Sequence, residues 1–195
     1  MDDYRIAVVC LALAVFARAD DPKPSPLAKN AAQVEAALAA LGQPLPAETV
    51  KALRTADAAA IHDALGDHAL LVVSINPEGR VKLARGPAEA TLVRGQRRFA
   101  VVKVLNASGA QQRLTVRGKY AGAAENPFAV AFVTQGGVTP DLTGLPVEYR
   151  LIEIMASTAG RHELTAVVEA GQGTQELGFR GEAPVLFTVR EAGKK

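Results

Sequence analysis

The sequence predicts a mainly β protein, an antiparallel β-sandwich of about eight strands preceded by two or three short N-terminal helices. Three observations lead to this prediction. Apolar residues recur at helical spacing only between residues 27 and 66, whereas apolar and polar residues alternate from residue 69 onward. Turn signals rich in Gly, Pro and Asn separate the alternating stretches. Because helices come only at the start, the pattern excludes a wound βαβ fold, and a partly open β-barrel is the alternative architecture.

Residues 1–19 have the pattern of a signal peptide. The apolar run Ile6–Phe16 is shorter than the roughly 20 residues that a membrane-spanning helix needs. Ala17 and Ala19 place small residues at the −3 and −1 positions of a cleavage site before Asp20. We therefore expect an exported protein, periplasmic or extracellular, whose mature chain has no integral membrane span. The alternative is that the segment stays uncleaved as an N-terminal anchor.

Composition narrows the function classes. The only cysteine, Cys10, lies in the apolar run after Val9, where a lipoprotein signal has a small residue, so the mature chain is expected to lack disulfides and thiolate sites. The net charge of +2, from 22 basic and 20 acidic residues, is too balanced for a nucleic-acid partner. The one basic cluster, Arg97-Arg98, fits a solvated strand edge. With no Trp and 5% aromatic residues, a carbohydrate-binding module is disfavoured.

The N-terminal part of the mature chain is expected to contain a linker at 20–26 and a helical segment at 27–66. Ser25 can cap the first helix, with Pro26 at its first position, and Gly42 ends it. The apolar stripe of this helix is Val34, Ala37, Leu38 and Leu41. A second helix is expected over about Ala47–Thr55, and a third over Ala58–Leu65 after the cap Asp57. Helices this short are marginal alone, so they must pack against another element.

The β-sandwich domain is expected over residues 67–191. Its predicted strands are Ala69–Ile75, Arg80–Arg85, Phe99–Leu105, Gln111–Arg117, Phe128–Val133, Val147–Met155, His162–Val168 and Val185–Val189. The segment Asn76–Gly79 matches a type I turn and predicts a hairpin. The expected core residues are Leu71, Val73, Ile75, Val102, Val104, Leu151, Leu164, Val168 and Phe187.

Few residues suggest chemistry. His62 and Asp63 with Asp67 and His68 form the pattern HD-x3-DH, which could supply two imidazoles and two carboxylates to a metal. Gly66 interrupts the helix between the two pairs, so we favour an exposed helical face followed by a turn. His162 is expected to be a half-buried strand residue. No catalytic, cofactor or metal residue is assigned, and we expect no cofactor and no enzyme activity.

Two further patterns have structural interpretations. Gly171-Gln172-Gly173-Thr174-Gln175 contains Gly-x-Gly, but it lies between strands and opens no helix, so a tight turn is favoured over a phosphate site. Glu148 and Arg150 share one strand face, as do Arg161 and Glu163, which predicts cross-strand ion pairs that are weak because they are exposed. An arginine-lined site for an acidic ligand is the alternative.

Four stretches carry a resemblance to a known family: Ile75–Lys82, Val102–Asn106, Leu142–Arg150 and Gly171–Arg180. In this order they resemble the N-terminal region of exported bacterial PHP-like metallohydrolases of the CehA/McbA type, over about residues 41–190. In that family the metal ligands belong to a later domain, and the present sequence ends at Lys195. The resemblance therefore implies a non-catalytic β-module and transfers no metal ligand.

Together these observations predict an exported, non-catalytic β-sandwich module that binds a protein partner. The alternative is a structural envelope protein that associates with itself through a sheet edge. A small metal-dependent enzyme using His62, Asp63, Asp67 and His68 is the third hypothesis.

Overall fold

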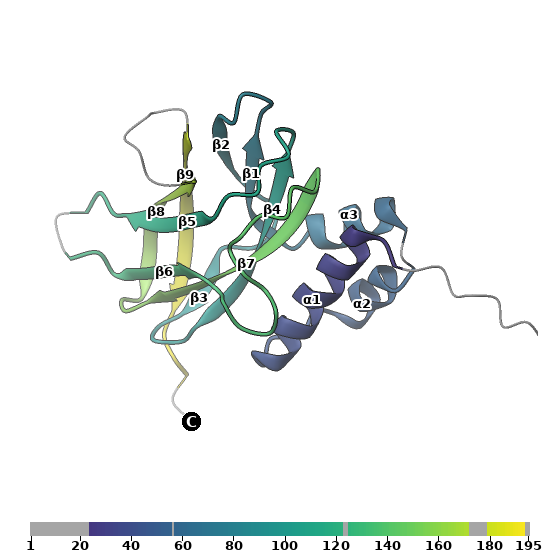
Figure 1. Cartoon of the computed structure of the whole chain (residues 1–195). Coiled ribbons are helices and arrows are strands. Elements are labelled where there is room, and N and C mark those ends of the chain that lie inside the picture. The colour runs from purple at the N-terminus through teal and green to yellow at the C-terminus, as the bar shows by residue number, and fades with distance from the viewer. Residues whose placement is uncertain (1–23, 56, 123–124, 172–178, 194–195) are drawn as a thin grey trace, which may run out of the picture.

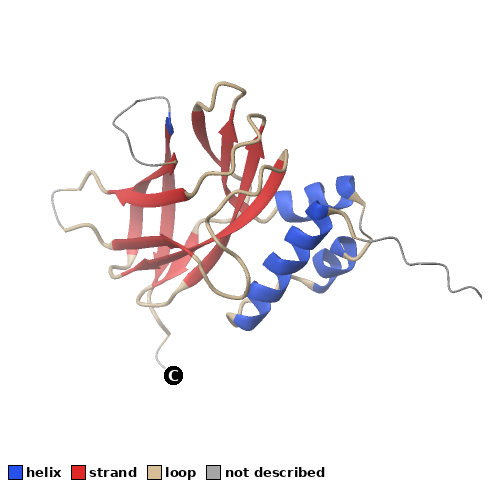
Figure 2. Ribbon diagram, in the orientation of Figure 1, coloured by secondary structure: helices blue, strands red, loops and turns tan. Residues whose placement is uncertain are grey.

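Three layers of secondary structure stack on one another in the computed structural model, which describes residues 24–55, 57–122, 125–171 and 179–193 (Figures 1 and 2). A layer of helices covers the outer face of a five-stranded sheet, and a four-stranded sheet covers its inner face. The prediction of a β-sandwich with N-terminal helices is confirmed. The predicted signal peptide and most of the Gly171–Gln175 segment lie outside the described residues.

The helical layer contains α1 (Pro26–Ala40), α2 (Ala47–Leu53) and α3 (Ala58–Gly66). The predicted caps are present. Ser25 Oγ accepts a hydrogen bond from the backbone N of Ala28 at 3.1 Å, and Asp57 Oδ2 accepts one from Ala60 N at 3.0 Å. None of the described helices is long and apolar enough to cross a membrane.

The five-stranded sheet has the order β2-β1-β4-β7-β6. Its strands are β1 (Ala69–Ile75), β2 (Val81–Arg85), β4 (Arg98–Asn106), β6 (Phe128–Phe132) and β7 (Val147–Ala156). The predicted hairpin joins β1 to β2: Gly79 N donates to Asn76 O at 2.9 Å, and Asn76 Oδ1 accepts from Arg80 N at 2.7 Å. Gly79 has φ of 78°, which favours glycine at this position.

The four-stranded sheet has the order β3-β9-β8-β5. Its strands are β3 (Thr91–Val93), β5 (Leu114–Lys119), β8 (Gly160–Ala170) and β9 (Arg180–Arg190). The expectation of antiparallel pairing holds except for β1 with β4 and β3 with β9, which pair in parallel. The first parallel pair arises because the chain leaves the five-stranded sheet after β2, forms β3 in the other sheet, and re-enters beside β1.

Two strands differ most from the sequence prediction. Strand β3 was not predicted, because three residues are too few to establish an alternating pattern. Strand β9 begins five residues before the predicted start and runs through Pro184. Proline lacks the N–H that a central strand needs, but β3 pairs only with Thr188–Arg190 of β9. Pro184 therefore has a strand neighbour, β8, on one side only.

Two hydrophobic cores lie on opposite faces of the five-stranded sheet. All nine predicted core residues are buried, at 2% exposure or less. Eight of them belong to the core between the sheets, whereas Leu151 points to the core beneath the helices. The helical core also contains Val34 and Leu38 of α1 and Ile61 of α3, so burial against the sheet stabilises helices that would be marginal alone.

The edges of the two sheets approach each other, which curls the sandwich. Strand β9 packs against β2, and a Cβ atom at Gly181 would lie 2.7 Å from the backbone N of Leu83, so only glycine permits this approach. At the other side β5 packs against β6, and the Asn126 side chain donates to Gly118 O at 3.2 Å.

Ion pairs cover the outer face of the four-stranded sheet. Arg117 of β5 pairs with Glu169 of the neighbouring strand β8, and Lys119 of β5 pairs with Glu182 of β9 on the far side of β8, each at 2.7 Å. Beneath their aliphatic stems Val167, which pairs with Arg117 and Glu182, is fully buried. No ion pair of the described residues includes Arg161 or Glu163, so the cross-strand ion pairs predicted for them are not formed there.

The Leu164→Ala substitution tests the core assignment. Leu164 is 1% exposed in the core between the sheets, so truncation is expected to lower the free energy of unfolding by about 2–5 kcal/mol. Leu186→Ala on the adjacent strand is the matched control: Leu186 is 48% exposed, and a change of about 0.5 kcal/mol or less is expected. Urea unfolding followed by circular dichroism measures both values, and equal losses would contradict the assignment.

Candidate functional site

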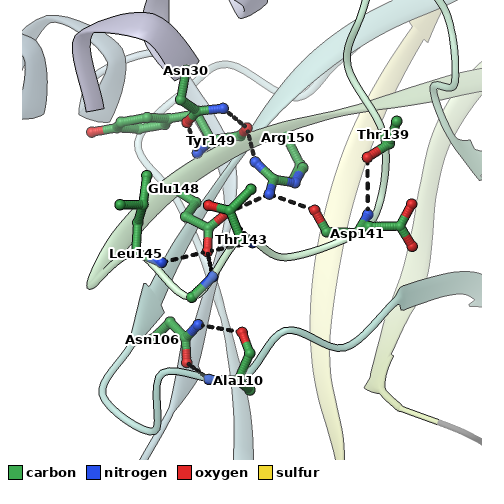
Figure 3. Close-up of polar contacts among 11 residues, drawn as sticks. Asn30, Asn106, Ala110, Thr139, Asp141, Thr143, Leu145, Glu148, Tyr149 and Arg150 are labelled. Atoms are coloured by element: carbon green, nitrogen blue, oxygen red, sulfur yellow. Dashed lines mark hydrogen bonds and ion pairs between the residues drawn. The ribbon is translucent and has the colours of Figure 1, made fainter. Parts of the chain in front are cut away.

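A groove of about 400 Å³ lies between the start of α1 and the loop that joins β6 to β7. Pro26, Lys29 and Asn30 line it from the helix, and Thr139, Asp141 and Arg150 are among the residues on the opposite side. Figure 3 shows the polar contacts beneath it. We take this groove as the candidate functional site, because a buried ion pair and a dense hydrogen-bond network form its base.

Glu148 holds the loop in place. Its side chain is fully buried and accepts hydrogen bonds from the backbone N–H groups of Thr143, Gly144 and Leu145, and from the Thr143 hydroxyl, at 2.8–3.1 Å (Figure 3). Three consecutive backbone donors around one carboxylate form a small anion-binding turn. The carboxylate therefore fixes the conformation of residues 143–145 from inside the protein.

Arg150 balances this buried negative charge. It is 3% exposed and pairs with Glu148 through Nη2. It also donates to the carbonyl oxygens of Tyr149, at 2.8 Å, and Asp141, at 2.6 Å. Its Nε–H has no hydrogen-bond partner among the described residues. A buried charge is tolerated when it is paired and hydrogen-bonded, and this pair meets both conditions apart from that one donor.

The prediction of weak, exposed cross-strand ion pairs for Glu148 and Arg150 is wrong, because the two residues are buried and pair with each other. The two residues do share a strand face, as predicted, but it is the inner face that also carries Ile152. The loop before β7 folds over this end of the sandwich and supplies the backbone donors to Glu148 and one backbone acceptor, Asp141 O, to Arg150. Alternation along one strand identifies a shared face but not whether a distant loop covers it.

Asn30 fastens α1 to the sheet through a pair of hydrogen bonds with the backbone of Tyr149. Tyr149 N donates to Asn30 Oδ1 at 2.7 Å, and Asn30 Nδ2 donates to Tyr149 O at 3.1 Å (Figure 3). Strand β6 pairs with β7 only from Ile152 onward, so the Asn30 amide takes the place of the missing strand. We did not predict this role. The available signal was a polar residue beside the apolar stripe of the helix.

Gln43 makes the same kind of contact one strand away. Phe99 N donates to Gln43 Oε1 at 3.0 Å, and Gln43 Nε2 donates to Arg97 O at 2.8 Å. Strand β1 pairs with β4 only from Val101 onward, so this amide also replaces an absent strand. Two side-chain amides of the helical layer thus complete the backbone pairing of the sheet.

The predicted metal-ligand pattern does not assemble into one site. His62 Nδ1 lies 3.3 Å from the Tyr149 hydroxyl, whereas His68 Nε2 lies 2.9 Å from Thr49 Oγ1. Among the described residues no three His, Cys, Asp or Glu side chains are placed to hold a metal ion together. His162 is half-buried as expected, with its Nε2 3.1 Å from Ala159 O and its ring against Tyr120 and Phe128.

A second hollow, of about 470 Å³, lies where the chain crosses between the sheets. Asp67, His68 and Arg98 are among its lining residues. Arg98 donates to Thr91 O at 2.6 Å, and Arg85 donates to Leu70 O, Gly86 O and Ala88 O, so both arginines hold the crossover segment. Burial lowers the pKa of both guanidinium groups. The hydrogen bonds of both arginines thus stabilise the crossover, and we assign them no further role.

Comparison with known proteins yields only distant likenesses. No family model matches the chain, and no curated protein matches it. Domains 4 and 5 of the S-layer protein SbsC align with a TM-score of 0.30 and 13% identity, over 52% of this chain and 47% of that one. PbICP-C in complex with falcipain-2 aligns with a TM-score of 0.31 and 8% identity, over 63% and 92%. An extracellular fragment of EsaA from Streptococcus gallolyticus aligns with a TM-score of 0.29 and 12% identity, over 84% and 41%.

The chain thus spans about half of the SbsC fragment and less than half of the EsaA fragment. At these TM-scores and identities the likenesses carry no inference about function. A functional proposal for this protein therefore depends on the residues of the groove.

The Glu148→Gln substitution tests the buried ion pair. It leaves the Arg150 charge buried without a counter-charge, so the free energy of unfolding is expected to fall by about 3–5 kcal/mol in urea unfolding. Glu169→Gln, which breaks the pair with Arg117 on the outer face, is the control with an expected loss of about 0–1 kcal/mol. Similar losses in the two variants would show that Glu148 is not a buried charge partner.

Burial, and to a smaller extent the nearby Asp63 carboxylate, raise the pKa of the Tyr149 hydroxyl to about 12. The unfolded chain loses this proton near pH 10, whereas the folded chain loses it near pH 12. The free energy of unfolding is therefore expected to fall by about 2–3 kcal/mol as the pH rises from 10 to 12. A Tyr4→Phe/Tyr120→Phe variant leaves Tyr149 as the only phenol. Its absorbance at 295 nm should titrate near pH 12, and titration near pH 10 in folded protein would refute the shift.

Proposed function

We propose that the chain is an exported, non-catalytic β-sandwich module that works by binding a protein partner. The observation that supports it best is the groove beside α1, whose two walls are fixed to the same strand. Asn30 holds the helix wall on β7, and Glu148 and Arg150 of β7 hold the loop wall. A pre-formed surface of this kind lowers the ordering cost of binding.

Two sequence observations support the same proposal. The signal-peptide pattern of residues 1–19 supports export of the module from the cytoplasm. The resemblance to the region preceding exported PHP-like hydrolases suggests an accessory role. An exported hydrolase that lacks its own N-terminal β-module would be a fitting partner.

Self-association through a sheet edge receives less support. Strands β2 and β9 approach each other, and so do β5 and β6, so the two sheets shield one another at these edges. The remaining edge strand, β3, is three residues long. Short or covered edges are poor templates for adding a strand from another copy.

Affinity capture tests the proposal. The full chain, expressed in its own cells with a C-terminal tag, is expected to retain a discrete, saturable partner that mass spectrometry identifies. Thr139→Arg, which fills the groove, should abolish retention, because Thr139 is exposed in the loop wall. Thr188→Arg, on the exposed outer face of β9, is the matched control and should leave retention unchanged.

Two outcomes would overturn the proposal. Retention of the chain's own copies alone would favour a self-associating structural role. Retention that survives Thr139→Arg would place the binding surface elsewhere on the molecule.

A further inference from the structure

We infer that the groove beside α1 recognises a carboxylate of the partner protein. This inference rests on the proposed function, because it names the chemistry of the contact that the module makes. Three features of the groove favour a negatively charged group there.

The first feature is the charge of the α1 N-terminus. The first turn of this 15-residue helix contains no acidic residue, and Lys29 lies there instead. The N-terminal end of a helix carries a partial positive charge, which acidic side chains usually offset. A lysine at this end adds to the positive charge and is repelled by it. Both Pro26 and Lys29 line the groove. The helix therefore presents positive potential to the groove at a cost to its own stability.

The second feature is the incomplete hydrogen bonding of Arg150. This residue lines the groove, is 97% buried, and has an Nε–H without a partner among the described residues. Buried donors are nearly always satisfied in native proteins. The guanidinium at the base of the groove therefore lacks one acceptor within the described part of the chain.

The third feature is the balance of the remaining charges. Glu148 is occupied by Arg150 and the loop backbone, and Asp141 pairs with Arg113 at 3.2 Å. Lys29 forms no ion pair with the described residues, so it leaves the groove with a net positive charge. The Thr139 hydroxyl oxygen accepts from Asp141 N, which leaves its proton available to donate.

These donors fit a carboxylate better than a phosphate. A carboxylate has one charge and two oxygens, which a single lysine and one or two hydrogen-bond donors can satisfy. Phosphate sites typically contain an arginine fork or a run of backbone N–H groups. Here the guanidinium of Arg150 already binds Glu148 and two carbonyl oxygens. The backbone donors of residues 143–145 are likewise engaged with Glu148.

Nuclear magnetic resonance titration of the full chain tests the inference with defined probes. Acetyl-diglycine carries a free C-terminal carboxylate, acetyl-glutamate amide carries a side-chain carboxylate, and acetyl-diglycine amide carries neither. We expect saturable shifts of the Lys29 and Thr139 amide signals with one or both acids, and binding at least about tenfold weaker with the amide. Which acid binds more tightly identifies the source of the carboxylate.

Two lysine variants provide the charge control. Lys29→Gln should weaken binding of the acid about tenfold, whereas Lys51→Gln, on the exposed side of α2, should leave it unchanged. Equal binding of acid and amide, equal binding of inorganic phosphate, an unaffected Lys29→Gln variant, or no shifts at 50 mM probe would each overturn the inference. If these failures occur while the partner is still captured in a groove-dependent way, the protein-binding proposal stands without the carboxylate.

Discussion

Strand β7 is buried on both of its faces, and the arrangement of the molecule follows from that constraint. Tyr149 and Leu151 point into the core beneath the helices, while Ile152 and Ile154 point into the core between the sheets. A strand enclosed in this way must find a partner for every backbone group and charge. The loop before β7 and Asn30 of α1 supply those partners at the end of β7 that β6 does not reach.

The same requirement explains how the helical layer is attached. Apolar contacts bury α1 against the sheet but do not fix its position along the strands. The amides of Asn30 and Gln43 each accept a backbone N–H and donate to a backbone carbonyl of a strand, which sets that position. Because α1 is held at Asn30, the Lys29 beside it is held at the rim of the groove. Packing and polar pairing therefore position the candidate site together.

The groove differs from the outer face of the four-stranded sheet in whether its charged groups have partners of opposite charge. On the outer face of the four-stranded sheet, acidic and basic residues pair across strands and shield an apolar residue. At the groove, a lysine occupies the unfavourable end of a helix, and a buried arginine has one donor without a partner among the described residues. Local departures from favourable electrostatics are expected at functional sites, where a ligand rather than the fold supplies the compensating group.

The sequence alone determined the local structure of this protein. Ser25 and Asp57 marked helix starts, Asn76–Gly79 marked the hairpin, and alternation identified buried residues such as Leu164 and Phe187, because each signal acts over a few residues. Only the tertiary structure decided the parallel pairs, the strand β3 and the burial of Glu148 and Arg150. These depend on which distant segments meet, and a strand's periodicity is the same whether its polar face meets water or a loop that supplies hydrogen bonds.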